Sequence, residues 1–199
     1  NNKFKIWLKV EVLACEALAK RGEIPKSALK DIQEKSDFKV ERIDEIEREV
    51  KHDVIAFLTC VGEYVGESAR YMHLGMTSSD VLDTALAVQL KQASTLILKE
   101  LKAFQAVLKT QALKHKMTPT IGRSHGIHAE PLTFGLKVAN WYEEVGRNIE
   151  RIKRARQVIS YGQISGAVGT FACIHPEVEG YVCAKLGLKP APVSTQIVQ

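Results

Sequence analysis

The feature that most constrains the fold is a long helical pattern that runs from Val81 to about His115. Its apolar residues are separated by 4, 4, 3, 4, 4, 3, 4 and 4 positions, and neither Gly nor Pro interrupts them. At 1.5 Å per residue, such a helix is roughly 50 Å long. A compact globule of 199 residues cannot bury it, so we expect a long helical neighbour and further chains. The apolar positions are Leu82, Leu86, Leu90, Ala93, Ile97, Leu101, Phe104, Leu108 and Ala112.

A second long amphipathic pattern follows and can supply that neighbour. We expect Pro131 in its first turn, and apolar residues then recur at helical spacing as far as Ile159. Residues 120–131 form a loop of about a dozen residues between the two patterns, which makes the two helices antiparallel neighbours.

The rest of the chain is also helical in pattern, and no stretch shows the alternation of a strand. Shorter helices are expected at residues 4–20, 25–32, 40–51 and 176–186. We therefore predict an all-α fold. A small N-terminal helical domain, residues 1–76, precedes residues 77–199, the first part of an oligomeric bundle of long antiparallel helices.

Bulk composition excludes some classes of function. Of the residues, 45% are hydrophobic and 26% are charged, as in ordinary globular proteins. The net charge of +5 suits small anionic substrates, but Lys and Arg are interspersed with Glu and Asp, so we expect no nucleic-acid partner. Because no apolar run reaches the length of a membrane span, we expect no membrane partner.

The cysteines and the chain ends indicate the compartment and the extent of the chain. The four cysteines show no CxxC spacing, and three lie in apolar helical context, which indicates buried free thiols in the reducing cytoplasm. The chain begins with Asn1 and no signal peptide, and Gln199 lies in a run with no stop signal. We therefore expect a piece of a longer protein. The cysteines are Cys15, Cys60, Cys173 and Cys183.

Residues 120–131 concentrate groups that can transfer protons. The segment reads Thr-Ile-Gly-Arg-Ser-His-Gly-Ile-His-Ala-Glu-Pro, with Ser124, His125 and His128 close together. An imidazole titrates near neutral pH, so a proton-transfer role is one hypothesis. The alternative is that these groups only cap two buried helix ends.

Two other polar clusters lie at expected helix starts. Lys51, His52 and Asp53 precede residues 54–58, which are apolar nearly all round and should be buried. The simpler alternative is that Asp53 caps this helix and His52 lies on the surface. Residues 77–80, Thr-Ser-Ser-Asp, offer more acceptors than one cap needs, so they form either an anion-binding helix start or a redundant cap.

The last quarter of the chain adds small residues and a further polar cluster. Glycines in residues 162–169 let the backbone approach another segment closely. The spacing of these glycines matches neither a P-loop nor a dinucleotide-binding loop. Ser194-Thr195-Gln196 follows two prolines. His125 and His128 lack a Cys or carboxylate at metal-ligand spacing, so we expect no metal.

Together these motifs resemble the adenylosuccinate lyases of the fumarase/aspartase superfamily. The resemblance is collinear and covers nearly the whole chain. The Lys-His-Asp and Thr-Ser-Ser-Asp runs are more similar to this branch than to argininosuccinate lyase or fumarase. Ser124 stands where the family usually has Thr. The similar segments are Lys-His-Asp-Val (51–54), His-Leu-Gly-Met-Thr-Ser-Ser-Asp-Val-Leu-Asp-Thr-Ala (73–85), Gly-Arg-Ser-His-Gly-Ile-His-Ala-Glu-Pro (122–131), Gly-Ala-Val-Gly-Thr (166–170) and Ser-Thr-Gln (194–196).

The resemblance implies a β-elimination of fumarate from adenylosuccinate, giving AMP, and from the related succinylocarboxamide ribotide of purine biosynthesis. By similarity, His125 is the general acid, and Thr77 and Ser78 hold a substrate carboxylate at the start of the long helix. The other substrate-binding residues that it implies are Lys51, His52, Asp53, His73, Ser124 and Gln196.

The resemblance also implies a homotetramer in the complete protein, without cofactor or metal. The family's general base is a Ser on a loop that this chain does not contain. We therefore expect the base beyond Gln199 and expect the 199-residue chain alone to be inactive. Two alternatives stay open: another lyase of the superfamily, such as argininosuccinate lyase, or a non-catalytic α-helical scaffold.

Overall fold

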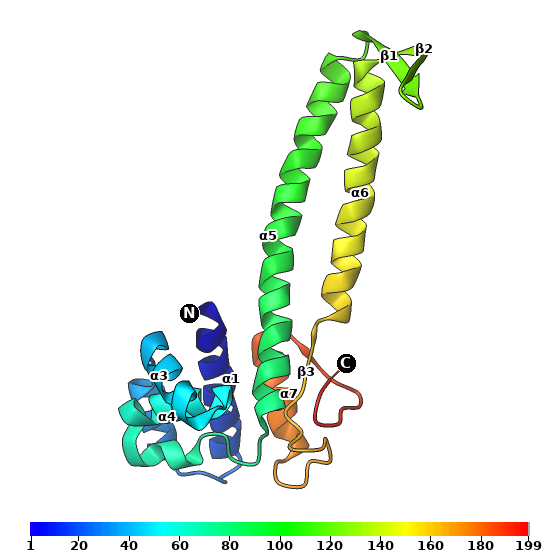
Figure 1. Cartoon of the computed structure of the whole chain (residues 1–199). Helices are drawn as coiled ribbons and strands as arrows, with labels where there is room; N and C mark the ends of the chain where they lie inside the picture. Colours follow the sequence, from blue (N-terminus) through cyan, green and yellow to red (C-terminus); the bar gives the residue numbers. More distant parts are fainter. Residues whose placement is uncertain (199) are drawn as a thin grey trace. The chain divides into compact units, whose positions relative to one another are not determined.

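The computed structural model describes residues 1–198, which form two compact units. The first unit contains residues 1–89 and the chain from Ser160 onward, and the second contains residues 90–159. Helix α5 (Ser78–Lys114) begins in the first unit and continues into the second (Figure 1). Within residues 1–198, none of the helices has both the length and the apolar content that crossing a membrane requires.

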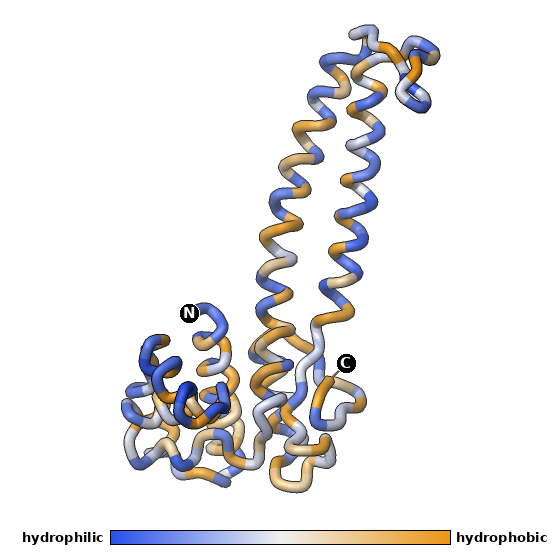
Figure 2. The backbone as a smooth tube through the Cα atoms, in the orientation of Figure 1, coloured by the Kyte–Doolittle hydropathy of each residue, from blue (hydrophilic) through white to orange (hydrophobic). Residues whose placement is uncertain are grey.

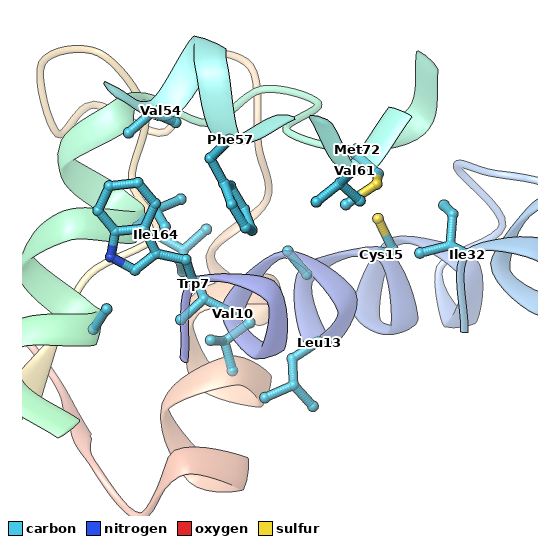
Figure 3. Close-up of a cluster of buried hydrophobic side chains, with 14 of the residues drawn as sticks. Trp7, Val10, Leu13, Cys15, Ile32, Val54, Phe57, Val61, Met72 and Ile164 are labelled. Atoms are coloured by element: carbon cyan, nitrogen blue, oxygen red, sulfur yellow. The ribbon is translucent and has the colours of Figure 1, made fainter. Parts of the chain in front are cut away.

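The first unit is a cluster of helices around the apolar side of α1. Trp7 of α1 packs edge-on against Phe57 of α4, with ring centroids 5.5 Å apart, and Val10 and Val61 join the same core (Figure 3). Of residues 54–58, which were expected to be buried, Val54, Ala56 and Phe57 are buried, Leu58 is partly buried and Ile55 is half exposed. Besides the start of α5, the unit contains α1 (Asn2–Lys20), α2 (Lys26–Lys35), α3 (Val40–Val50), α4 (Asp53–Val65), the 3₁₀ helix η1 (Gly66–Tyr71), α7 (Pro176–Leu186), and the parallel pair β3 (Tyr161–Gly162) and β4 (Lys189–Pro190).

The second unit is an antiparallel pair of long helices. The part of α5 from Leu90 runs beside α6 (Phe134–Val158), and the two helices are joined at one end by a β-hairpin (Figure 1). Gly135 permits close contact at that end, because a Cβ there would lie 2.5 Å from the carbonyl oxygen of Ala112. The core of this pair is small and consists of Leu98, Leu108, Val138, Val145 and Ile149.

Most of the apolar pattern that predicted α5 is not covered by this chain. Hydrophobic residues recur along both helices of the second unit (Figure 2), yet Ile97 is 47% exposed and Phe104 is 51% exposed. Trp141 of α6 is 41% exposed. The helix itself is confirmed, and its exposed apolar side is what the sequence predicted for a helix that needs further partners.

The connection between α5 and α6 corrects two predictions. Residues 120–131, expected as a loop in a chain without strands, lie in an antiparallel hairpin of β1 (Pro119–Ser124) and β2 (Ile127–Thr133). Pro131, expected in the first turn of a helix, is in β2, and Thr133 caps α6 by accepting a hydrogen bond from the N–H of Leu136. The strands were not recognised because both faces of the hairpin are largely exposed, so no hydrophobic alternation marks them.

A substitution at Gly75 tests the close packing of the first unit. Gly75 has φ of +74°, and a Cβ at this position would lie 2.1 Å from the carbonyl oxygen of Cys173. We expect Gly75→Ala to lower the free energy of unfolding by about 2 kcal/mol or more, since a strained φ and a backbone clash add. Chemical denaturation measures the change. Gly180→Ala, in α7 with no atom within 4 Å of the new Cβ, should be neutral or stabilising, and equal effects would contradict this packing.

Candidate active site

The start of α5 is held by the carboxylate of Asp80. Its Oδ2 accepts a hydrogen bond from the backbone N–H of Thr77 at 2.9 Å, the reciprocal half of a capping box. The hydroxyl of Thr77 makes no hydrogen bond within residues 1–198, so it is available to a ligand. Free N–H groups and the helix dipole at this end favour an anion.

Asp80 also connects the helix start to the glycine-containing segment. Its side chain is fully buried, with Oδ1 accepting from the N–H of Ser165 and Oδ2 from that of Gly166, each at 3.0 Å. Burial raises the pKa of this carboxyl group above its ordinary value, and the three N–H donors oppose that rise. Gly166 has φ of +82°, which only glycine adopts readily.

His52 joins two of the polar clusters. It is the N-cap of α4, where its Nδ1 accepts a hydrogen bond from the N–H of Ile55 at 3.4 Å. An accepting Nδ1 places the ring proton on Nε2, and Nε2 lies 3.5 Å from the hydroxyl of Ser78. The cap of this helix is therefore His52 and not Asp53, whose Oδ1 accepts from the N–H of Val54 instead.

Lys51 is the least constrained of the candidate residues. It ends α3 in the left-handed region, with φ of 55°, and its side chain is exposed. It lines an open surface pocket with Asp44, Glu47 and Arg48, in which both signs of charge are present. This pocket therefore shows no selectivity for an anion.

His73 is bound by a residue that the sequence did not single out. Glu11 of α1 accepts from the backbone N–H of His73 at 2.9 Å and contacts its Nδ1 at 2.7 Å. Burial lowers the pKa of the imidazole, but the hydrogen bond and charge of Glu11, with the charge of Asp80, outweigh it and leave the pKa above its ordinary value. No sequence motif marks Glu11, because it is a single carboxylate among the regularly spaced apolar residues of a helix.

The segment around Gln196 lies against the start of α5. The side chains that make this contact were not predicted from the sequence. Gln163 donates from Nε2 to the carbonyl oxygen of Gln196 at 2.8 Å, and Asp83 accepts from the N–H of Val198 at 3.0 Å. Gly169 allows this approach, because a Cβ there would lie 2.2 Å from the carbonyl oxygen of Ser194. The expected close approach of the glycine segment to another backbone is confirmed.

Ser124 and His125 belong to the second unit, at the tip of the hairpin. His125 and Gly126 form its two-residue turn, with φ of 51° and 77°. Positive φ at both positions is typical of a type I′ turn, whose twist matches that of the strands. The imidazole is exposed, so the turn presents it outward on a short and well-defined backbone.

Backbone strain coincides with the candidate residues. Among residues 1–198, the non-glycine residues with positive φ are Lys51, His73, His125 and Phe171, and the first three were predicted from the sequence as site residues. Such conformations cost about 1–3 kcal/mol each and concentrate at functional sites. Within residues 1–198, no group of three or more His, Cys, Asp or Glu side chains is arranged to hold a metal.

Comparison with known proteins gives the family of this chain. A family model described as "Lyase" matches residues 1–198. The chain belongs to this lyase family. The lyase motifs noted above, from Lys51 to Gln196, all lie within the matched residues.

Curated relatives of this chain include several adenylosuccinate lyases. That of Bacillus subtilis is 54% identical over 198 residues, which is 100% of this chain and 46% of the relative. That of Synechocystis sp. is 55% identical over 196 residues, which is 98% of this chain and 46% of the relative. The chain thus spans about half the length of the curated relatives that it matches.

Solved structures confirm the expected fold class of the chain. A 3-carboxy-cis,cis-muconate lactonizing enzyme from Pseudomonas putida matches with a TM-score of 0.88 and 28% identity, over 96% of this chain and 46% of that one. A fumarate lyase from Mesorhizobium sp. matches with a TM-score of 0.88 and 26% identity, over 96% and 47%. The helical fold is therefore shared with lyases of the fumarase/aspartase type.

Replacing Asp80 tests whether one carboxylate organises the first unit. Asp80→Asn keeps the volume but loses an acceptor, leaving at least one of the three N–H groups that now bond to Asp80 unpaired. We expect a loss of about 1–3 kcal/mol or more in the free energy of unfolding, measured by denaturant titration. Asp44→Asn removes an exposed carboxylate of α3 and should change stability little. A loss of equal size in both variants would contradict the role of Asp80.

Proposed function

We propose that the complete protein containing this chain is an adenylosuccinate lyase, a carbon-nitrogen lyase that releases fumarate from adenylosuccinate to form AMP. The same site would act on the succinylocarboxamide ribotide of purine biosynthesis. The observation that carries the proposal is 51–55% identity to four adenylosuccinate lyases over 98–100% of this chain.

His125 is the proposed general acid. A β-elimination needs a base that removes the proton beside a carboxylate and an acid that protonates the departing nitrogen. The exposed position of His125 on a two-residue turn supports the role, because its imidazole is open to solvent. Ser124, at the end of β1, would contact substrate beside it.

Thr77 and Ser78 would bind a substrate carboxylate. The available hydroxyl of Thr77 and the dipole of α5 support this assignment. Lys51, His52 and Asp53 would bind the nucleotide side of the substrate, and the contact of His52 with Ser78 supports a common site.

The two remaining proposed contacts lie in the first unit. His73 would face the phosphate, since Glu11 and Asp80 favour its charged form. Gln196 would contact substrate from a segment that hydrogen bonds to Gln163. No cofactor is part of the proposal.

The complete protein is proposed to be a cytoplasmic homotetramer whose sites draw on several protomers. Apolar residues exposed along α5 and α6, such as Phe104 and Trp141, support further helical partners. The buried free thiols of Cys15, Cys60 and Cys183 support a reducing compartment. A domain boundary between Met76 and Thr77, and a general base beyond residue 199, remain part of the proposal.

Replacing His125 in the complete protein tests the reaction. We expect His125→Gln to lower kcat by about 100- to 10,000-fold, the usual contribution of a positioned imidazole, measured by fumarate release from adenylosuccinate. His115→Gln is the matched control, because the His115 ring contacts the hydroxyl of Thr118 and the ring of Phe134, neither of which is a proposed site residue. If the protein is instead a non-catalytic scaffold, there is no turnover for either substitution to change. An unchanged kcat in His125→Gln would refute the assigned role.

The chain by itself should not turn over substrate. We expect residues 1–199 alone to release no fumarate, because the proposed base and the remaining helices are absent, whereas the complete protein is active. A coupled fumarate assay on both proteins measures the difference. Full turnover by the shorter chain would contradict the division of the site.

Product inhibition separates the proposal from another lyase of the superfamily. AMP should compete with substrate in an adenylosuccinate lyase, while an argininosuccinate lyase should respond to the amino acid that it releases. The identities above favour the first outcome.

A further inference from the structure

Glu11 is an unusual residue for its position. It lies within α1 among residues that build the core of the first unit, and its side chain is fully buried (0% exposed). Val10, Leu13 and Cys15 belong to the apolar cluster of this unit, together with Val61 and Met72 (Figure 3). Burying a carboxylate is costly unless its oxygens are well paired, so the contacts of Glu11 require an explanation.

Both carboxylate oxygens of Glu11 bind the same distant residue. Oε2 accepts from the backbone N–H of His73 at 2.9 Å, and Oε1 lies 2.7 Å from its Nδ1. His73 has φ of 60°, so Glu11 holds both a strained backbone and a ring. An ionised carboxylate only accepts hydrogen bonds, so Nδ1 carries a proton and Nε2 is the ring nitrogen left for another group.

The charges around His73 favour an imidazolium ion. Glu11 from α1 and Asp80 from α5 are the charged groups that act on the ring, and together they outweigh its burial. Burial and the charge of Glu11 raise the pKa of the nearby Cys15 thiol to about 12, so this thiol stays neutral. The His73 side chain is 22% exposed, so part of it is accessible to a ligand.

We infer that Glu11 is a positioning residue that holds the His73 imidazole with a proton on Nδ1, so that Nε2–H is presented to an anionic group of the substrate. The inference rests on the proposed function only for the substrate, a nucleotide with carboxylate and phosphate groups. The inference extends the site to α1, whose other buried residues are all apolar.

Glu11→Gln in the complete protein reverses this arrangement without a change in size. The single amide oxygen can accept the N–H of His73, and the amide NH₂ then donates to Nδ1, which removes the Nδ1 proton and leaves a neutral ring protonated only on Nε2. Solid-state ¹⁵N NMR of histidine-labelled protein reports the tautomer, and the His73 signal is identified by its loss in His73→Gln. We expect a protonated Nδ1 in the wild type, an unprotonated Nδ1 in Glu11→Gln, and a lower pKa of His73 in that variant.

Kinetics of the same variants test the consequence for substrate. We expect Glu11→Gln to raise KM for adenylosuccinate by about tenfold or more, the value of a charge-assisted hydrogen bond, with a smaller change in kcat. In a His73→Gln background the further effect of Glu11→Gln should vanish, because residues that act through one another are not additive. Glu16→Gln is the control, since Glu16 of α1 bonds to Gln33 and Tyr181 and, within residues 1–198, to no histidine.

Separate results would overturn the inference and the proposed function. An unprotonated Nδ1 on His73 in the wild type overturns the inference even if Glu11→Gln fails to fold. Fully additive KM effects of the two substitutions also overturn it, because a purely structural Glu11 would not act through His73. If the wild-type protein releases no fumarate from adenylosuccinate, the proposed function fails, while the ¹⁵N measurement still tests how Glu11 holds the ring.

Discussion

The buried carboxylate of Asp80 is the interaction on which the first unit depends. It accepts three backbone N–H groups, from Thr77, Ser165 and Gly166, and these belong to segments more than 80 positions apart in the chain. A buried carboxylate with unpaired oxygens would destabilise the fold, and buried N–H groups without an acceptor would do the same. The start of α5 and the glycine-containing segment therefore have to fold together.

Glycine and left-handed backbone conformations make that convergence possible. Gly75 and Gly169 lie where a Cβ would contact a carbonyl oxygen at 2.1–2.2 Å. Side-chain pairs then complete the arrangement, with Glu11 on His73 and Gln163 on Gln196. The Oε1 of Gln163 is buried without a partner among residues 1–198, next to the segment proposed to contact substrate. Polar groups of this kind are retained at some cost in stability, which is common at functional sites.

The second unit faces a different constraint. Its two helices bury few apolar residues against each other, and Leu96, Ile97 and Phe104 stay exposed. A helix of 37 residues has more apolar length than one antiparallel neighbour can cover. The match to only 46% of each relative's length fits a helix pair that represents part of a larger helical assembly.

The sequence by itself determined the helices, the lyase family and most of the polar segments of the candidate site. Periodicity is a local property, so α5, α6 and α7 could be read with bounds within a few residues, and the motifs at 51–54 and 122–131 are contiguous. Tertiary structure decided the rest. The hairpin around His125 has no buried face to create an alternating pattern, and the roles of Glu11, Asp80 and Gln163 depend on partners tens of positions away. Which acceptor meets which N–H is decided by packing, because the same carboxylate in an isolated helix would simply be hydrated.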